Sequence, residues 1–186
     1  TNYDWTFERA IAGYKSSMNL FDGFRSTKLG TFWDARAFRN FKGTKWGWDF
    51  IYFKLHGSTS WYIQQDGRII KTTHAERDPG GLKTMLIYPT LAKRKQIDVD
   101  PYLTSYRYLE YCLSKGARLC VVIGFSFRDR EINEVIKRAV LVNKLVHFVV
   151  VDPHPNEAQV LAALNIDRGR VEFVREEFRY YGKDTN

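Results

Sequence analysis

The fold of this chain is decided by the stretch Leu119-Cys-Val-Val-Ile-Gly124-Phe125-Ser126, where a continuous apolar run leads into a small-residue turn. Such a run is typical of a buried strand in an open α/β sheet, whose ligands bind beyond the carboxyl ends of the strands. The chain then alternates helices and strands: a helix capped by Asp129, an apolar strand at Val146–Val151, a helix opened by Pro155 and a short strand at Val171–Val174. This alternation predicts an α/β fold with a parallel sheet covered by helices on both faces.

The rest of the chain is less regular but carries local signals. Asp100-Pro101 marks a helix start, because Asp is a common N-cap and Pro fits the first helical turn. Asp66-Gly67 lies between Trp61–Gln65 and Arg68–Thr72, and this spacing predicts a β-hairpin with a two-residue turn. Residues 15–48 hold many glycines and aromatic residues without a clean period, so we expect an irregular region there.

Two further segments place polar side chains after apolar runs, namely Thr1–Asp4 and the expected strand Phe50–Leu55 with His56 behind it. An imidazole titrates near neutral pH, so His56 can act as a general base, and Gly57 would let a ligand approach the backbone closely. Because strand ends share one crevice, we expect these segments to meet the Gly124 turn. The alternatives are a histidine hydrogen-bonded at a strand end and, for Asn2 and Asp4, an ordinary turn.

The second half offers candidate nucleotide contacts. Gly124 and Ser126 lie between a strand and a helix, where small residues leave backbone N–H groups free for phosphate. Asp152 ends an apolar strand, and a carboxylate there commonly accepts hydrogen bonds from an adenosine ribose. The alternatives are a plain strand-to-helix turn at Gly124 and a helix cap or turn at Asp152.

Length and composition limit the class of protein. The 186 residues suit one α/β domain, and the formal net charge of +8 favours nucleic acid, anionic lipid or phosphorylated ligands. The tightest basic cluster, Lys93-Arg94-Lys95, fits a solvated loop, with nucleic-acid contact as the alternative. Cys112 and Cys120 lie in apolar segments without a CxxC partner, which predicts buried reduced thiols. No apolar run approaches the roughly 20 residues of a membrane span, so we expect a cytoplasmic protein.

Four short segments follow one another in a fixed order: Asn2-Tyr3-Asp4, Leu55-His56-Gly57-Ser58 with Trp61, Ile123 to Asp129, and Val149 to Pro153. Together they resemble the sirtuin-like family of NAD-consuming proteins. The motif Gly124-Phe-Ser-Phe-Arg-Asp129 is more similar to the corresponding motif of the bacterial branch than to that of the deacylases. The family's glycine-rich loop and the deacylases' paired CxxC zinc module are absent from the sequence, so we expect the loop on a segment before Thr1 and no zinc.

The resemblance implies a doubly wound, mainly parallel Rossmann-like sheet with a small irregular or helical subdomain and a β-hairpin insertion. Residues 15–48 would form the variable small subdomain and residues 50–186 the nucleotide-binding α/β portion, together the C-terminal, larger part of one domain. NAD would be the substrate. Asn2 would position water beside the anomeric carbon, Asp4 would bond the nicotinamide amide or stabilise positive charge, and His56 would assist attack at the same ribose.

The activity that the resemblance implies is NAD hydrolysis to nicotinamide and ADP-ribose. Gly124 and Ser126 would contact the phosphate or the adenosine ribose. Relatives in this branch mostly belong to bacterial anti-phage systems, in which a homo-oligomer or a regulatory partner releases the activity. We expect residues 1–186 alone to bind NAD poorly. The alternatives are a non-catalytic nucleotide sensor or nucleic-acid-associated assembly module, and a protein ADP-ribosyltransferase or deacylase.

Overall fold

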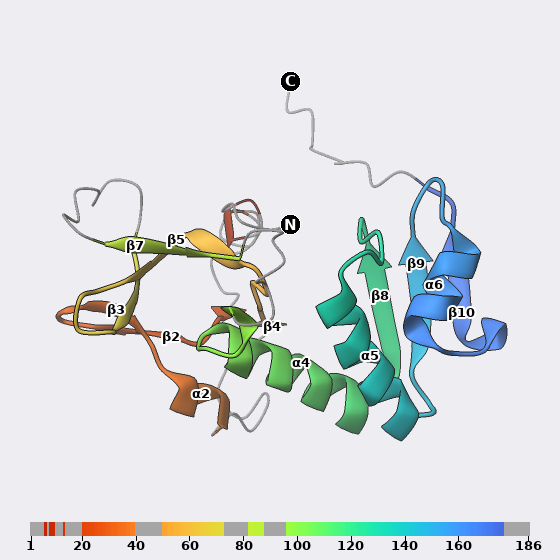
Figure 1. The fold of residues 1–186 in the computed structure, drawn as a ribbon, viewed down its shortest axis with the longest axis horizontal. Helices are drawn as coiled ribbons and strands as arrows, with labels where there is room; N and C mark the ends of the chain where they lie inside the picture. Colours follow the sequence, from red (N-terminus) through yellow and green to blue (C-terminus); the bar gives the residue numbers. More distant parts are fainter. Residues whose placement is uncertain are drawn as a thin grey trace. The chain divides into compact units, whose positions relative to one another are not determined.

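The computed structural model describes residues 6, 8–9, 13, 20–39, 50–72, 82–87 and 96–176. The chain divides into two compact units, Thr1–Tyr106 and Arg107–Asn186, called unit 1 and unit 2 here. Helix α4 (Tyr102–Lys115) contains the boundary between them. Unit 1 holds mainly strands, and unit 2 alternates strands and helices, so the α/β class is confirmed (Figure 1).

Unit 1 is built on a five-stranded antiparallel sheet in the order β2-β3-β6-β5-β7. Its strands are β2 (Phe24–Thr27), β3 (Gly30–Trp33), β5 (Gly57–Ile63), β6 (Ile69–Lys71) and β7 (Lys83–Leu86). The described residues of this part also form the parallel pair β1 (Leu20–Phe21) and β4 (Phe50–Ile51), and helix α2 (Ala35–Arg39). The antiparallel sheet therefore joins segments from both sides of residue 50, which the aperiodic sequence before residue 48 did not indicate.

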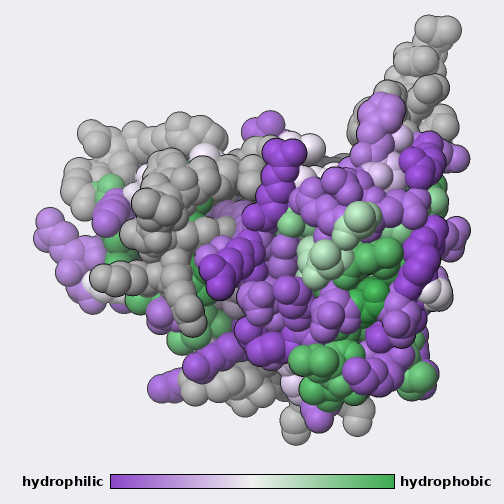
Figure 2. All heavy atoms as spheres, turned by 45° about the vertical axis from the view of Figure 1, so that its right-hand side comes forward, coloured by the Kyte–Doolittle hydropathy of each residue, from purple (hydrophilic) through white to green (hydrophobic). Residues whose placement is uncertain are grey.

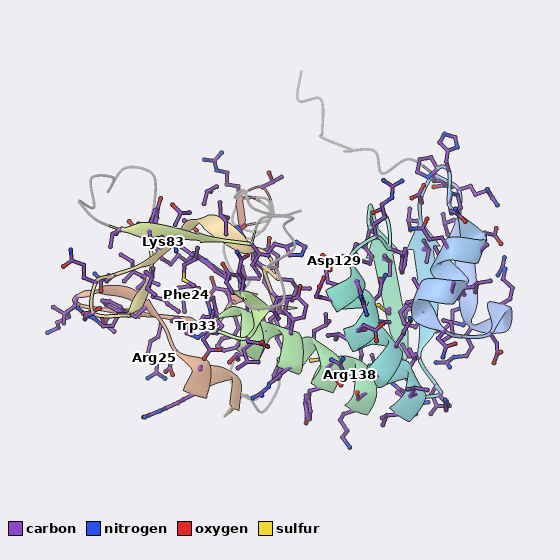
Figure 3. All side chains as sticks on the ribbon, viewed as in Figure 1. Phe24, Arg25, Trp33, Lys83, Asp129 and Arg138 are labelled. Carbon is purple, nitrogen blue, oxygen red and sulfur yellow. The ribbon has the colours of Figure 1, made fainter. Side chains whose placement is uncertain are left out.

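Aromatic side chains pack together on this sheet. The ring of Phe24 lies 5.3 Å from that of Trp33 and 5.0 Å from that of Trp61, measured between centroids (Figure 3 labels Phe24 and Trp33). Trp61 is only 3% exposed, so it belongs to the core of unit 1. Aromatic rings bury large apolar areas, and this cluster holds β2, β3 and β5 together.

The hairpin predicted around Asp66-Gly67 is present as β5 and β6, but its loop is longer than expected. The N–H of Gly67 donates to the Gln64 carbonyl and the N–H of Gln64 donates to the Arg68 carbonyl, each at 2.9 Å. Gln64 and Arg68 are therefore the last hydrogen-bonded pair, and residues 65–67 form a three-residue loop between them. Gly67 in this loop has φ +81°. A turn followed by a glycine bulge in the left-handed region is the next most common hairpin connection, and the sequence Asp-Gly fits it equally well.

Unit 2 contains a three-stranded parallel sheet in the order β10-β9-β8. Its elements after α4 are β8 (Leu119–Ile123), α5 (Arg130–Val142), β9 (His147–Val151), α6 (Glu157–Leu164), the 3₁₀ turn η3 (Arg168–Arg170) and β10 (Val171–Val174). All three predicted strands are present, and Asp129 caps α5 as predicted by accepting a hydrogen bond from the N–H of Ile132. The N-cap of α6 is Asn156, one residue after Pro155.

The helices of this sheet lie on one face, which differs from the doubly wound expectation. Both crossovers, β8 to β9 and β9 to β10, advance in the same direction, so right-handed connections place α5 and α6 on the same side. The two helices contact each other there (Figure 1). A doubly wound sheet requires the strand order to reverse direction, and the described strands contain no such reversal.

The opposite face of the parallel sheet is more exposed than the continuous apolar sequence suggested. On β8, Leu119, Val121 and Ile123 are 57%, 52% and 48% exposed, whereas the alternate residues are half-buried. On β9, Phe148 and Val150 are 0% and 2% exposed. An apolar run alone does not distinguish a strand buried on two faces from one buried on a single face, so the two-sided cover expected from sequence is not found in the described residues.

Candidate functional site

His56 lies in a tight turn that leads into β5. The N–H of Gly57 donates to the Lys54 carbonyl at 3.0 Å, which closes the turn, and the N–H of Ile87 donates to the His56 carbonyl at 2.9 Å. The His56 side chain is half-buried. Because β4 ends at Ile51, His56 precedes a strand of an antiparallel sheet instead of ending a long strand as expected. Hydrogen bonds on both sides of the residue fix the backbone that carries the imidazole.

Gly57 is required by the protein's own backbone. It has φ +85°, and a Cβ atom at this position would lie 2.2 Å from the carbonyl oxygen of Met85 and 2.8 Å from the hydroxyl oxygen of Tyr102. Real Cβ atoms do not approach a backbone oxygen this closely. The sequence suggested that Gly57 admits a ligand, but β7 and Tyr102 already occupy that space. The glycine therefore sets the shape of the turn beside His56.

A buried polar cluster, which we call the Lys54 cluster, joins the two ends of this turn. It consists of Glu8, Lys54, Ser58 and Ser60. The Lys54 Nζ atom lies 2.8 Å from Glu8 Oε1 and donates to Ser58 Oγ at 3.1 Å, and the Ser58 and Ser60 hydroxyls lie 2.9 Å apart. The side chains of Lys54 and Glu8 are 2% and 12% exposed. Sequence reasoning assigned no role to these residues, although a lysine inside the apolar run Phe50–Leu55 was a visible signal.

The candidate nucleotide contacts of unit 2 leave the sheet side by side. Ile123 and Val151 are register partners on β8 and β9, so Gly124 and Asp152 follow adjacent strand ends. Gly124 has φ +64°, which favours glycine, and nothing lies within 4 Å of a Cβ built there. Gly124 and Ser126 are exposed and Asp152 is half-buried. The structure therefore brings these three residues to one edge of the parallel sheet, as expected from sequence.

Local bonds hold this edge in shape. The Gln159 side chain of α6 donates to the Ser126 carbonyl at 2.9 Å. The Asp152 carboxylate accepts a hydrogen bond from the N–H of His154 at 2.8 Å, and the Asp152 N–H donates to the Val174 carbonyl at 3.0 Å. One oxygen of Asp152 thus supports its own loop, as the alternative interpretation of a turn predicted. Asp152 itself directly follows β9, beside the end of β8 that precedes Gly124.

Two residues missed by sequence reasoning shape the loop between β8 and α5. Phe127 is 4% exposed, has φ +55° and packs on Phe125 with ring centroids 4.9 Å apart. Asn133, which is 8% exposed, donates from its side chain to the Phe127 carbonyl at 2.8 Å. Left-handed backbone in a non-glycine residue is uncommon, so the buried ring and the Asn133 bond hold it in place. A buried asparagine beside Ile132 in an otherwise apolar helix face was the available signal.

Several expected residues lie outside the described part of the chain. They are Asn2, Asp4 and the basic cluster Lys93-Arg94-Lys95. Cys112 and Cys120 are free cysteines, and burial raises the pKa of both thiols, to about 11 for Cys120. A raised pKa keeps the thiol protonated at neutral pH, so neither is a candidate nucleophile. Within the described ranges, no group of three or more His, Cys, Asp or Glu side chains is arranged to hold a metal ion.

The fold and site define an α/β protein whose parallel strands end in a glycine turn and a carboxylate, with a histidine held separately in a tight turn. Comparison with protein families matches the SIR2-like domain over residues 1–168. The chain therefore belongs to the SIR2-like domain family, and this membership is consistent with an NAD-related activity. A search of curated proteins found no match. Among the helices in the described ranges, none is both long enough and apolar enough to cross a bilayer.

Proposed function

We propose that this protein is an NAD glycohydrolase that cleaves NAD to nicotinamide and ADP-ribose. The observation that carries the proposal is the family match, because residues 1–168 include every candidate site residue. The turn geometry supports a role for His56, since two backbone hydrogen bonds fix its position. The sheet edge with Gly124, Ser126 and Asp152 supports binding of a nucleotide, since ligands of α/β sheets bind beyond the carboxyl ends of the strands.

The proposed reaction breaks one bond and forms one. The bond between the anomeric carbon of the ribose and the nicotinamide nitrogen breaks through an oxocarbenium-like transition state, and nicotinamide leaves with the bonding electron pair. A water molecule positioned by Asn2 adds its oxygen to that carbon, and His56 assists this attack as a general base and takes up the proton released. Asp4 bonds the nicotinamide amide or stabilises the developing positive charge.

The adenosine half of NAD gives the remaining candidate residues their roles. Backbone N–H groups at Gly124 and Ser126 contact a phosphate or the adenosine ribose, because small residues leave the backbone accessible. The Asp152 carboxylate accepts hydrogen bonds from ribose hydroxyls. Under this proposal the protein acts in an anti-phage system in which a partner or an oligomer releases the activity. That biological role rests on the family resemblance alone.

The first test follows nicotinamide release from NAD by the natural full-length protein. We predict that His56→Ala lowers the rate by about a hundredfold or more, because general-base assistance contributes that much to proton transfer. Asn2→Ala should lower the rate as well. His147→Ala is the matched control, since His147 is a half-buried histidine at the start of β9 with no proposed role. Chromatography of the products distinguishes hydrolysis from ADP-ribose transfer.

Other outcomes identify the alternatives. Full activity of His56→Ala would remove the assignment of this residue. NAD binding without turnover under every condition would indicate a nucleotide sensor. Turnover of an acyl-lysine peptide would indicate a deacylase, and ADP-ribose attached to protein would indicate a transferase.

A further inference from the structure

The Lys54 cluster connects Glu8 to the turn that carries His56, one of the proposed catalytic residues. Glu8 lies four residues after Asp4 in sequence, and Lys54 lies two residues before His56. Glu8 and Lys54 form an ion pair with 2.8 Å between Oε1 and Nζ.

The same lysine also closes the turn around His56. Lys54 begins the turn and Ser58 follows it, and the bond from Lys54 Nζ to Ser58 Oγ, at 3.1 Å, joins the residues on either side. Ser58 and Ser60 are 0% and 2% exposed, so water does not compete for these bonds. A displacement of Glu8 would therefore move the ammonium group that bridges the turn.

Stability alone does not explain this arrangement. A buried ion pair contributes little net stability, because the cost of removing both charges from water offsets their attraction. Glu8 Oε2 is buried and has no hydrogen-bond partner among the described residues, which adds a further cost. A cluster with these costs, placed at the turn that carries His56, is best explained by the geometry that it imposes on that turn.

We propose that Glu8 and Lys54 are positioning residues that hold in place the turn that carries His56. The inference rests on the proposed NAD hydrolysis for its effect on the reaction. Neither residue touches the substrate in this scheme. Lys54 acts through the turn and Glu8 acts through Lys54, so their loss affects turnover more than NAD binding.

The test compares Glu8→Gln with a matched control, Asp22→Asn, in the natural full-length protein. Asp22 pairs with Lys71 at 2.5 Å, and the side chains of Asp22 and Lys71 are 13% and 18% exposed, so this is another largely buried ion pair of unit 1. Each substitution keeps the shape of the side chain and removes one charge. The other carboxylate oxygen of Asp22 accepts a hydrogen bond from the N–H of Phe24, and neither Lys71 nor Phe24 is a candidate site residue.

We expect Glu8→Gln to lower kcat about tenfold or more per folded molecule and to change the KM for NAD less than about threefold, since small displacements of catalytic groups reduce rates strongly. Asp22→Asn should keep kcat within about twofold of the wild type, even if it lowers the melting temperature as much as Glu8→Gln does. The double variant Glu8→Gln with Lys54→Met should be no slower than Lys54→Met alone, because residues of one network act as a unit.

A second measurement does not depend on activity. The ring signals of His56, assigned by their loss in His56→Ala, should shift in the NMR spectrum of Glu8→Gln and stay unchanged in Asp22→Asn. If the wild type releases no nicotinamide, the proposed function fails and the NMR comparison alone decides whether Glu8 positions His56. Unchanged His56 signals in Glu8→Gln, or an equal loss of kcat in Asp22→Asn, would overturn the inference.

Discussion

At the scale of single residues, two glycines of unit 1 allow two destabilising effects of a glycine-to-alanine substitution to be measured separately. These are the strain of a left-handed backbone and the steric overlap of the new Cβ atom. Gly57 and Gly67 have nearly the same backbone angle, with φ of +85° and +81°. A Cβ at residue 57 would lie 2.2 Å from the Met85 carbonyl oxygen, whereas one at residue 67 would meet nothing within 4 Å. The pair therefore distinguishes left-handed backbone strain from steric overlap.

We predict that Gly67→Ala lowers the free energy of unfolding by about 1–2 kcal/mol, the cost of left-handed backbone in an alanine. Gly57→Ala should cost at least about 2 kcal/mol more, because the neighbouring atom belongs to the backbone of β7 and cannot rotate away. Urea denaturation of both variants measures the difference. Equal losses would show that β7 moves aside at no cost, which would also weaken the idea of a rigid turn at His56.

At the scale of elements, the parallel sheet of unit 2 has one face against helices and one exposed face. Val121 on β8 is 52% exposed, whereas Val150 on β9 is 2% exposed. Their alternating positions follow from the pleat of the strand, in which successive side chains point to opposite faces. Valine and threonine share the same branched shape, so a threonine substitution tests burial with little change in strand preference.

We predict that Val150→Thr lowers the free energy of unfolding by about 1–3 kcal/mol, because it buries a hydroxyl group under the helices. Val121→Thr should change it by no more than about 0.5 kcal/mol, as is usual for exposed positions. Thermal and urea denaturation provide the measurement. A large loss for Val121→Thr would mean that the exposed face of β8 is covered in solution.

At the scale of the whole molecule, the formal net charge is +8, and several basic side chains of the described residues are paired with carboxylates. In unit 2, Arg138 pairs with Glu110, and Arg168 and Arg175 both pair with Glu157. Figure 3 labels Arg138 on α5, and Figure 2 shows hydrophilic residues interspersed with hydrophobic patches on the face turned forward. Basic side chains paired with carboxylates on the same surface attract a polyanion less than an unpaired stripe would.

We predict that the protein binds duplex DNA or RNA only at low salt and loses this binding near about 0.15 M salt, where surface charges are screened within about 8 Å. A gel-shift titration at increasing salt measures this. Replacing Lys93, Arg94 and Lys95 with glutamine should weaken the low-salt binding to nucleic acid only as much as the loss of three positive charges explains. Binding that persists at 0.15 M and disappears in this variant would favour the nucleic-acid module over the enzyme.

Part of the candidate site was predictable because its signals are local. Strand ends follow from apolar runs, so Gly124, Ser126 and Asp152 were placed correctly at one sheet edge. The roles of Lys54 and Glu8 were not predictable, because 46 positions separate them in sequence and only folding brings their charges together. Gly57 was expected to admit a ligand, but the close neighbour in the structure is the Met85 carbonyl oxygen of β7. This contact joins residues that are distant in sequence, so local pattern did not indicate it.

The sequence by itself determined the α/β class, the parallel strands of unit 2, the cap at Asp129 and the hairpin at Asp66-Gly67, because hydrophobic period, capping and turn chemistry act within a few residues. Only the tertiary structure decided that α5 and α6 share one face, that β2 and β3 join the sheet of β5 to β7, and that a buried lysine bridges the turn at His56. These features depend on the direction of crossovers and on contacts between distant segments, and neither property is encoded in local pattern.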